Sequence, residues 1–266
     1  QRGTFSRLLV DGAFPWRDAF FAHPCNIDHH VKFKKWQYKN MIEIRNLNVF
    51  YKDKKLLREL DFDMSEGKFI GITGASGSGK SLFAKSLIRL FDDDFRVRAD
   101  KFSIYKKDIL KLSQNELKEH RKKVAALVFQ NSIASLHPLL NVGDHFNAYL
   151  DGDKRANKEL AFAYFREFGL DNANLIWHKY SYELSGGEAS RVQIALALCL
   201  KPKILICDEI TSGLDSISGS HVAGILESLK GKMSVIFISH DEALTNYLSD
   251  EIWQMRDGRL NLKENA

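Results

Sequence analysis

The chain has 266 residues, of which 44% are hydrophobic and 27% are charged, and its formal net charge is +5. This length can bury one substantial core or two small ones, and the balanced composition excludes a disordered chain. Residues 1–40 hold seven Lys and Arg against three Asp, which leaves the remainder of the chain close to neutral. A nucleic-acid surface needs a basic body, so we expect no nucleic-acid partner.

No apolar run in the sequence reaches the roughly 20 residues that span a bilayer. The first residues do not read as a secretory signal, because aromatic residues, Asp and His interrupt any apolar stretch. If the protein works at a membrane, a partner must therefore span it. The three cysteines form no disulfide framework, and Cys199 and Cys207 stand in apolar surroundings where we expect small buried hydrophobes. These features favour a cytoplasmic location.

Residues 1–40 contain two of the four prolines and show no sustained periodicity. Met41 then opens a strand-like alternation of apolar and polar residues. We expect Met41 to be the natural start, and residues 1–40 to be an N-terminal extension or an upstream reading-frame product. Four residues of this segment have a spacing that matches no standard zinc pattern, so an ordinary tail is favoured over a metal site. These four are His23, Cys25, His29 and His30.

From Met41 onward, the predicted strands and helices alternate. This order is typical of an α/β fold with a mostly parallel or mixed sheet covered by helices. The predicted strands are 68–73, 124–129, 204–207 and 234–238, and the predicted helices are 80–91, 113–122, 142–150, 154–168, 185–200 and 215–229. The helices between Gln130 and Ser185 interrupt the series. They predict a helical subdomain, about residues 131–184, inserted into a domain that spans residues 41–266.

A glycine-rich segment follows the predicted strand 68–73 and opens a helix, which is the context of a P-loop. Its glycines let backbone N–H groups point inward at phosphate oxygens, and the helix N-terminus adds partial positive charge. We expect Lys80 to reach the β- and γ-phosphates of ATP and Ser81 to bind Mg²⁺. The predicted nucleotide-binding residues of the loop are Gly74, Ala75, Ser76, Gly77, Ser78, Gly79, Lys80 and Ser81.

Two acidic residues, Asp208 and Glu209, follow the apolar strand 204–207. The carboxyl ends of parallel strands face the ligand crevice of such a sheet. We therefore expect Asp208 to hold Mg²⁺ through water and Glu209 to orient and polarise the attacking water, a role worth about 10²–10⁴ in rate. A solvated strand edge is the alternative for two acids taken alone, and the P-loop makes that alternative weak.

A second glycine-containing helix start occurs at residues 184–188, with the sequence Leu-Ser-Gly-Gly-Glu. Ser185 stands where a helix N-cap belongs, and Gly186 and Gly187 let a ligand approach the backbone closely. One P-loop is sufficient to bind the phosphates of one nucleotide. We therefore expect this second anion-binding helix start to serve a nucleotide held by another subunit.

With this element, the sequence resembles the ATPase subunits of ABC transporters from about Met41 to Leu260, and residues 184–188 match the family's signature motif. The resemblance implies roles for the other matching positions. Tyr51 matches the aromatic residue that stacks on adenine, and Gln130 matches the Q-loop glutamine that senses Mg²⁺ and faces the membrane subunit. Asp215 matches the D-loop aspartate at the dimer interface. His240 matches the switch histidine that contacts the γ-phosphate. The implied set thus has Glu209 and His240 as catalytic residues.

Two positions depart from the family pattern. Ile210 stands where the family usually has Pro, and Glu188 replaces the commoner Gln after the signature glycines. Neither Ile210 nor Glu188 removes a phosphate- or metal-binding group, so we expect an active ATPase.

The resemblance also assigns ligands. It implies that Gln130 binds the metal together with Ser81 and Asp208, and that Glu188 contacts the nucleotide together with the other signature residues.

The resemblance also implies partners and a location. Two motor subunits, identical or paralogous, sandwich two ATP molecules and drive two transmembrane permeases from the cytoplasmic face of the inner (plasma) membrane. The segments 129–138 and 141–144 resemble those of peptide and nickel importers. In such importers, an extracytoplasmic substrate-binding protein delivers the cargo. The short stretch after Gly258 is more similar to the nickel type.

Three alternatives belong to the same superfamily. A motor subunit of an exporter for lipid or drug remains open, because exporters can also carry the motor on a separate chain. A DNA-repair or chromosome-structuring ATPase would need long heptad runs, for which the interval 130–185 is too short. A translation-associated ABC protein would carry two motor domains in one chain, and this chain has one P-loop and one signature.

Overall fold

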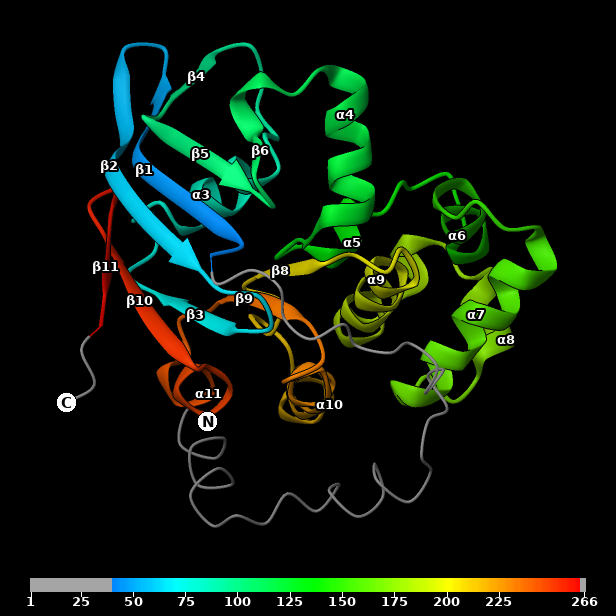
Figure 1. The fold of residues 1–266 in the computed structure, drawn as a ribbon. Helices are drawn as coiled ribbons and strands as arrows, with labels where there is room; N and C mark the ends of the chain where they lie inside the picture. Colours follow the sequence, from blue (N-terminus) through cyan, green and yellow to red (C-terminus); the bar gives the residue numbers. More distant parts are fainter. Residues whose placement is uncertain (1–39, 264–266) are drawn as a thin grey trace.

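The computed structural model describes residues 40–263, which form two sheets and the helices that cover them (Figure 1). The larger sheet has the strand order β11-β10-β3-β9-β8-β7, and its strands are parallel except for β11, which pairs antiparallel with β10. The bounds are β3 Phe69–Thr73, β7 Ala125–Val128, β8 Ile204–Asp208, β9 Ser234–Ile238, β10 Glu251–Arg256 and β11 Arg259–Leu262.

Strands β3, β8 and β9 are buried along their whole length, because helices or a second sheet cover both faces. Alternate side chains of the same strand therefore enter two different cores. On β8, for example, Leu205 and Cys207 belong to the core formed with α9 and α10, whereas Ile204 and Ile206 belong to the core formed with α3 and the second sheet. Burial raises the pKa of Cys207 and raises that of Cys199 to about 12. Both thiols are small buried groups, as predicted.

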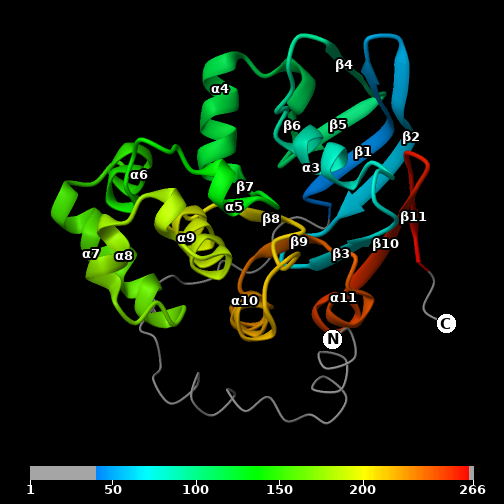
Figure 2. The same cartoon turned by 180° about the vertical axis from the view of Figure 1, so that it is seen from behind.

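Helices α10 and α11 lie on the opposite side of the larger sheet from the second sheet, as the front and back views show (Figures 1 and 2). Helix α3 lies between the two sheets and carries Phe83 and Leu87 into their shared core. The bounds are α3 Lys80–Leu87, α9 Gly186–Cys199, α10 Ser216–Leu229 and α11 Glu242–Leu248. The predicted extension of α3 to Phe91 is wrong, because Arg89 adopts a left-handed φ of 45°.

The second sheet is antiparallel, and the sequence patterns predicted only its first strand. Its bounds are β1 Ile42–Tyr51, β2 Lys54–Met64, β4 Phe95–Arg98, β5 Lys101–Ile104 and β6 Lys107–Asp108. Asn46 and Glu59 adopt left-handed φ values of 52° and 49°, and the register of β1 against β2 shifts beside them. The bulge at Glu59 breaks the period of two in β2, so the alternation of this strand is hard to follow in the sequence.

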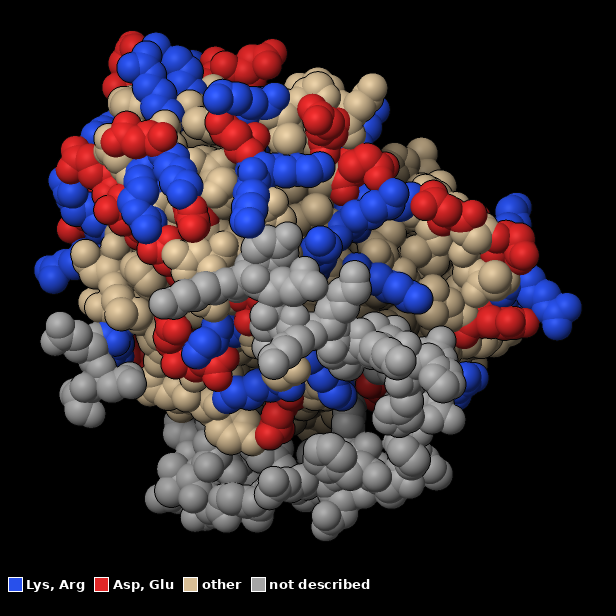
Figure 3. Space-filling view, viewed as in Figure 1, with Lys and Arg blue, Asp and Glu red and all other residues tan. Residues whose placement is uncertain are grey.

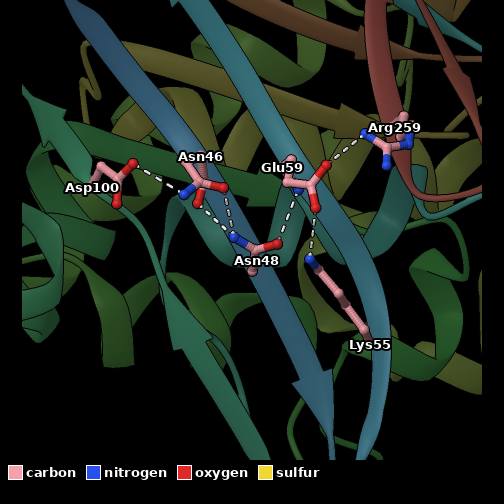
Figure 4. A network of polar contacts seen from close by, with 6 residues as sticks. All are labelled: Asn46, Asn48, Lys55, Glu59, Asp100 and Arg259. Carbon is pink, nitrogen blue, oxygen red and sulfur yellow. Dashed lines mark hydrogen bonds and ion pairs between the residues drawn. The ribbon is translucent and has the colours of Figure 1, made fainter.

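A polar network fills the region around these bulges (Figure 4). The Asn48 side chain donates to Asn46 Oδ1 and accepts from the backbone N–H of Glu59, at 2.9 and 3.0 Å. The Glu59 carboxylate accepts from Lys55 and, at 2.9 Å, from Arg259 on β11. The network therefore joins the C-terminal hairpin to β2 through side chains.

Between β7 and α9 the chain is helical and stands to one side of both sheets (Figure 1). This interval contains α5 Ser132–Ser135, α6 Val142–Tyr149, α7 Lys154–Glu167, α8 Ala173–His178 and a 3-10 turn, Ser181–Glu183. Before β7, Ser113 and Glu116 form the predicted capping box of α4, Gln114–Glu119. A π-helical turn, His120–Val124, replaces the last turn that the sequence predicted as α-helix.

On the face drawn in Figure 3, positive and negative side chains are interspersed over the antiparallel sheet. Within residues 40–263, no helix combines the length and the apolar character that a membrane crossing requires. The expectations for residues 1–39, including the four potential metal ligands, lie outside the described residues.

Candidate nucleotide-binding site

The P-loop connects the buried strand β3 to α3, and its backbone takes a shape that favours glycine. Gly74, Gly77 and Gly79 have positive φ values of 146°, 75° and 116°. A Cβ atom on Gly74 would lie closer than 3 Å to the carbonyl oxygen of Met255 on β10. The loop is therefore packed against β10, and glycine is required at position 74 both by its φ and by this close approach.

Gly258 links the P-loop to the antiparallel sheet through its backbone. Its N–H donates to the carbonyl oxygen of Ser78 at 3.0 Å, and its carbonyl oxygen accepts from the N–H of Arg58 at 2.8 Å. Asp257 and Gly258 both have positive φ, as a two-residue hairpin turn requires. The sequence contained this Asp-Gly turn signal, but nothing in it pointed to the P-loop as its neighbour.

The ammonium group of Lys80 lies at the centre of the site and is only 4% exposed. Its Nζ donates to the carbonyl oxygens of Gly74 and Ala75 at 2.9 and 3.0 Å. It also lies 3.3 Å from Oε1 of Glu209. A buried charge is tolerated when it is paired and hydrogen-bonded, and both conditions hold here.

The Glu209 carboxylate forms one cluster with three other predicted residues, Lys80, Gln130 and His240. Besides Lys80, it accepts a hydrogen bond from Gln130 Nε2 at 3.1 Å and lies 3.8 Å from His240 Nδ1. Glu209 has a left-handed φ of 48°, and its N–H donates to the carbonyl oxygen of Ile238. This backbone strain turns the residue away from the line of β8 and toward Lys80, an arrangement typical of functional positions.

Ser81 and Asp208 form an adjacent pair of oxygen donors. Ser81 Oγ donates to Asp208 Oδ1 at 3.0 Å. Burial raises the pKa of Asp208, and the nearby Glu209 carboxylate raises it further, against the lowering effects of Ser81 and Lys80. A cation bound between these oxygens would offset both causes of the raised pKa.

The predicted signature and D-loop residues form a second cluster, which lies at the starts of α9 and α10. Ser185 and Glu188 make a reciprocal capping box at the start of α9. Asp215 caps α10, accepting hydrogen bonds from the N–H groups of Ile217 and Ser218 at 3.0 and 2.9 Å. The two helix starts are in contact, since a Cβ on Gly187 would meet the Ser218 side chain closer than 3 Å.

The structure thus divides the predicted site residues between two places. Lys80, Glu209, Gln130 and His240 meet at the P-loop, whereas Ser185, Gly186, Gly187, Glu188 and Asp215 meet at the α9–α10 contact. Tyr51 lies apart on β1, 39% exposed, with its ring 5.1 Å from that of Phe95. Sequence reasoning missed Lys179, whose ammonium pairs with Glu188. An isolated lysine gives no sequence signal of this kind.

Comparison with known proteins shows the family to which the chain belongs. The ABC transporter family profile matches residues 57–212, which is more than half of the chain. The chain is 30% identical over 230 residues to the dipeptide transport ATP-binding protein DppD of Haemophilus influenzae, covering 83% of this chain and 70% of that protein. It is 31% identical over 228 residues to the metal-staphylopine import system ATP-binding protein CntD of Staphylococcus aureus, covering 83% and 84%.

The fold is shared with the ATP-binding cassette MJ0796, solved as a dimer in a post-hydrolysis state bound to ADP and Pi. The TM-score is 0.73 at 24% identity, over 84% of this chain and 98% of that one. The chain belongs to the ABC transporter family, as an ATP-binding cassette ATPase. This confirms the predicted family, fold class and ATPase activity.

Proposed function

We propose that this chain is the ATP-hydrolysing motor subunit of an ABC importer that takes up nickel or small peptides through partner permeases. The observation that carries the motor role is the meeting of Lys80, Gln130 and His240 around the Glu209 carboxylate. These groups come from the P-loop, the end of β7 and the ends of β8 and β9. Their convergence supports a single reacting centre beside the P-loop.

The residues present fit both ATP and Mg²⁺. Positive-φ glycines shape the loop, and Ser78 Oγ is buried with no hydrogen-bond partner among the described residues. Lys80 supplies the cation for phosphate oxygens. Ser81 and Asp208 supply the hard oxygen ligands that Mg²⁺ prefers, with Gln130 as a further oxygen donor. When bound there, Mg²⁺ would supply charge neutralisation at the β- and γ-phosphates.

Each residue then has a distinct task in the proposed reaction. Lys80 exchanges its contacts with Glu209 and two carbonyl groups for contacts with phosphate oxygens. Glu209 is thereby free to accept a hydrogen bond from the attacking water and to orient it. His240 lies on the other side of Glu209 and contacts the γ-phosphate. Tyr51 stacks on adenine, which its exposed position at the end of β1 allows.

The second cluster supports a dimer in which two ATP molecules are shared. Ser185 caps a helix of 14 residues that begins with Gly186 and Gly187, and the N-terminus of such a helix favours phosphate. We propose that it receives the nucleotide held by the P-loop of a second motor, identical or paralogous. Asp215, at the same contact, would then lie at the dimer interface.

The partner permeases are proposed to dock in a groove of about 680 Å³ beside the helical subdomain. Residues of the segment 129–140, which contains Gln130, line one wall of this groove, and α9 lines another through Leu196 and Ala197. A permease segment seated there would press on the same stretch of chain that carries Gln130. This would place the motor at the cytoplasmic face of the inner (plasma) membrane.

The domain division and the cargo are parts of the same proposal. Residues 41–266 form the ATPase domain with the helical subdomain at about 131–184, and residues 1–40 are an extension. Peptide or nickel cargo is favoured because relatives at about 30% identity are named for dipeptide and metal-staphylopine import. A substrate-binding protein outside the membrane would deliver this cargo to the permeases. An exporter of lipid or drug is the alternative.

The test is uptake of labelled nickel and labelled small peptides by cells that carry the wild-type chain or Glu209→Gln. The matched control is Glu159→Gln, which removes an exposed acid of α7 whose ion-pair partner is Arg155 on the same helix. We expect uptake of one cargo to collapse in Glu209→Gln and to persist in Glu159→Gln. If neither uptake falls, the importer proposal is wrong and export of lipid or drug becomes the leading function.

A further inference from the structure

The proposed signature of this chain contains an acid, Glu188, close to the place where the phosphates of a second nucleotide would bind. Glu188 is the third residue of α9, and its Oε2 accepts from the Ser185 N–H at 2.8 Å. This capping box stabilises the helix start. It also fixes a negative charge within one turn of Gly186 and Gly187, the residues proposed to receive the phosphates of a second nucleotide.

A single lysine faces this carboxylate. Lys179 Nζ lies 3.0 Å from Oε1 and 3.1 Å from Oε2 of Glu188. The two side chains are 20% and 23% exposed, so water screens this pair less than a surface pair. Although burial opposes the charged form, the Ser185 N–H, Lys179 and Arg191 together lower the pKa of Glu188. The carboxylate is therefore ionised at neutral pH.

The backbone of Lys179 is fixed from two sides. Lys179 caps the C-terminus of α8, and its N–H donates to the carbonyl oxygen of Ile176. Its own carbonyl oxygen accepts from the N–H of Val142, at the start of α6. The ammonium group thus projects from a position that two helices hold, and the loop 179–184 leads directly from it to the signature.

We propose that Lys179 is a positioning residue that neutralises Glu188, so that the first turn of α9 can receive the phosphates of ATP bound by a second copy of this chain. This inference rests on the proposed function, because it takes the second nucleotide as the ligand. Without Lys179, the charge of Glu188 would cancel part of the positive potential at the start of α9 and repel the phosphates. With Lys179 present, the capping box and an anion-binding helix start coexist.

The test measures the dissociation constant of the dimer, by analytical ultracentrifugation of the full chain with Mg²⁺ and ATP. The parent for all variants is Glu209→Gln, which slows hydrolysis so that a bound dimer persists. Adding Lys179→Met should weaken dimerisation roughly tenfold, because one uncompensated charge then faces the phosphates. Lys179→Arg, which keeps the charge, should weaken it less than Lys179→Met does.

The decisive variant is the double change Lys179→Met with Glu188→Gln. Glutamine can still close the capping box but carries no charge. We expect the double variant to recover the dissociation constant of the parent, and Glu188→Gln alone to dimerise more tightly than the parent. The control is Lys158→Met, which removes a helical-subdomain lysine bonded to Asn174. This control should show none of the weakening.

The possible failures are distinct. Lys179 does not act by neutralising Glu188 if Lys179→Met dimerises as tightly as the parent does. The same conclusion follows if adding Glu188→Gln to Lys179→Met fails to restore the dissociation constant of the parent. Thermal unfolding of each variant identifies a misfolded Lys179→Met, and the double variant then decides the question, since only charge compensation predicts its recovery. A parent that stays monomeric with Mg²⁺ and ATP overturns this inference, which requires a second copy of this chain, whereas the proposed function also allows a paralogous second motor and is tested separately by the uptake experiment.

Discussion

The ammonium nitrogen of Lys80 lies 3.3 Å from a carboxylate oxygen of Glu209. The residue proposed to bind phosphate and the residue proposed to orient water are therefore in direct ionic contact. Phosphate oxygens must compete with this carboxylate for Lys80. The contact also makes the position of Glu209 sensitive to whether Lys80 is engaged elsewhere.

Glu209→Gln should therefore change binding and catalysis in opposite directions. We expect ATP to bind more tightly, because the neutral amide competes less for Lys80, and the hydrolysis rate to fall by about 10²–10⁴ because the water loses its base. Calorimetric titration with ATP and single-turnover hydrolysis measure the two effects. Glu159→Gln is the control for both. Unchanged affinity would show that the Lys80–Glu209 contact does not oppose nucleotide binding.

Gly187→Ala should destabilise the contact between α9 and α10. The added methyl group would lie closer than 3 Å to the side chain of Ser218, whereas a methyl on Gly186 would meet only Leu214, at 3.4 Å. We expect a loss of about 1–3 kcal/mol in the free energy of unfolding for Gly187→Ala, measured with urea, and less for Gly186→Ala. Ser218→Gly should restore part of the loss, since it removes the atoms in conflict.

The stability of the protein should depend on pH through His120. This side chain is 4% exposed, and its Nε2 lies 3.0 Å from the carbonyl oxygen of Leu87 at the end of α3. Burial is the main cause that lowers the pKa of His120, and the charge of Arg121 adds to it. The unfolded chain therefore binds this proton more readily than the folded protein does. Folding stability therefore falls as the pH decreases from about 6.5, the pKa of histidine in the unfolded chain, through the lower pKa of His120 in the folded protein.

His120→Gln tests this dependence, because glutamine can still donate to Leu87 but does not titrate. We expect the melting temperature of the wild type to fall more steeply between pH 7 and pH 5 than that of His120→Gln. The exposed His178 provides the control, since His178→Gln should leave the pH profile of the wild type intact. Parallel profiles for His120→Gln and the wild type would contradict a role for His120.

The proposed permease groove can be tested at its rim. Tyr149 lines the groove and is 53% exposed, so an acid there adds charge to an apolar docking surface without disturbing the core. We expect Tyr149→Glu to reduce cargo uptake by cells far more than it reduces ATP hydrolysis by the purified chain. Leu175→Glu, at a similarly exposed position on α8, is the control. An equal fall of uptake and hydrolysis would contradict docking at this groove.

The sequence predicted those parts of the site whose chemistry requires a fixed local pattern. The P-loop, the acids at the end of β8 and the helix N-cap at Ser185 are each set by neighbours within a few residues, so local reasoning could find them. Strand β2 of the antiparallel sheet escaped because the bulge at Glu59 interrupts its alternation, whereas β1 alternates clearly before Asn46 and was predicted. The pairing of Lys179 with Glu188 escaped for another reason, since it depends on how the loop 179–184 folds back onto α9.

The backbone hydrogen bonds of Gly258 have a consequence for folding during synthesis on the ribosome. The P-loop is synthesised early, yet the carbonyl of Met255 and the N–H of Gly258 that pack against it are made about 180 residues later. Such distant contacts form late, because closing the long loop between them is costly in entropy. A nascent chain that already contains the P-loop, Asp208 and Glu209 would still lack one wall of the proposed nucleotide pocket. Competence to bind ATP should therefore arise only as the last hairpin leaves the ribosome.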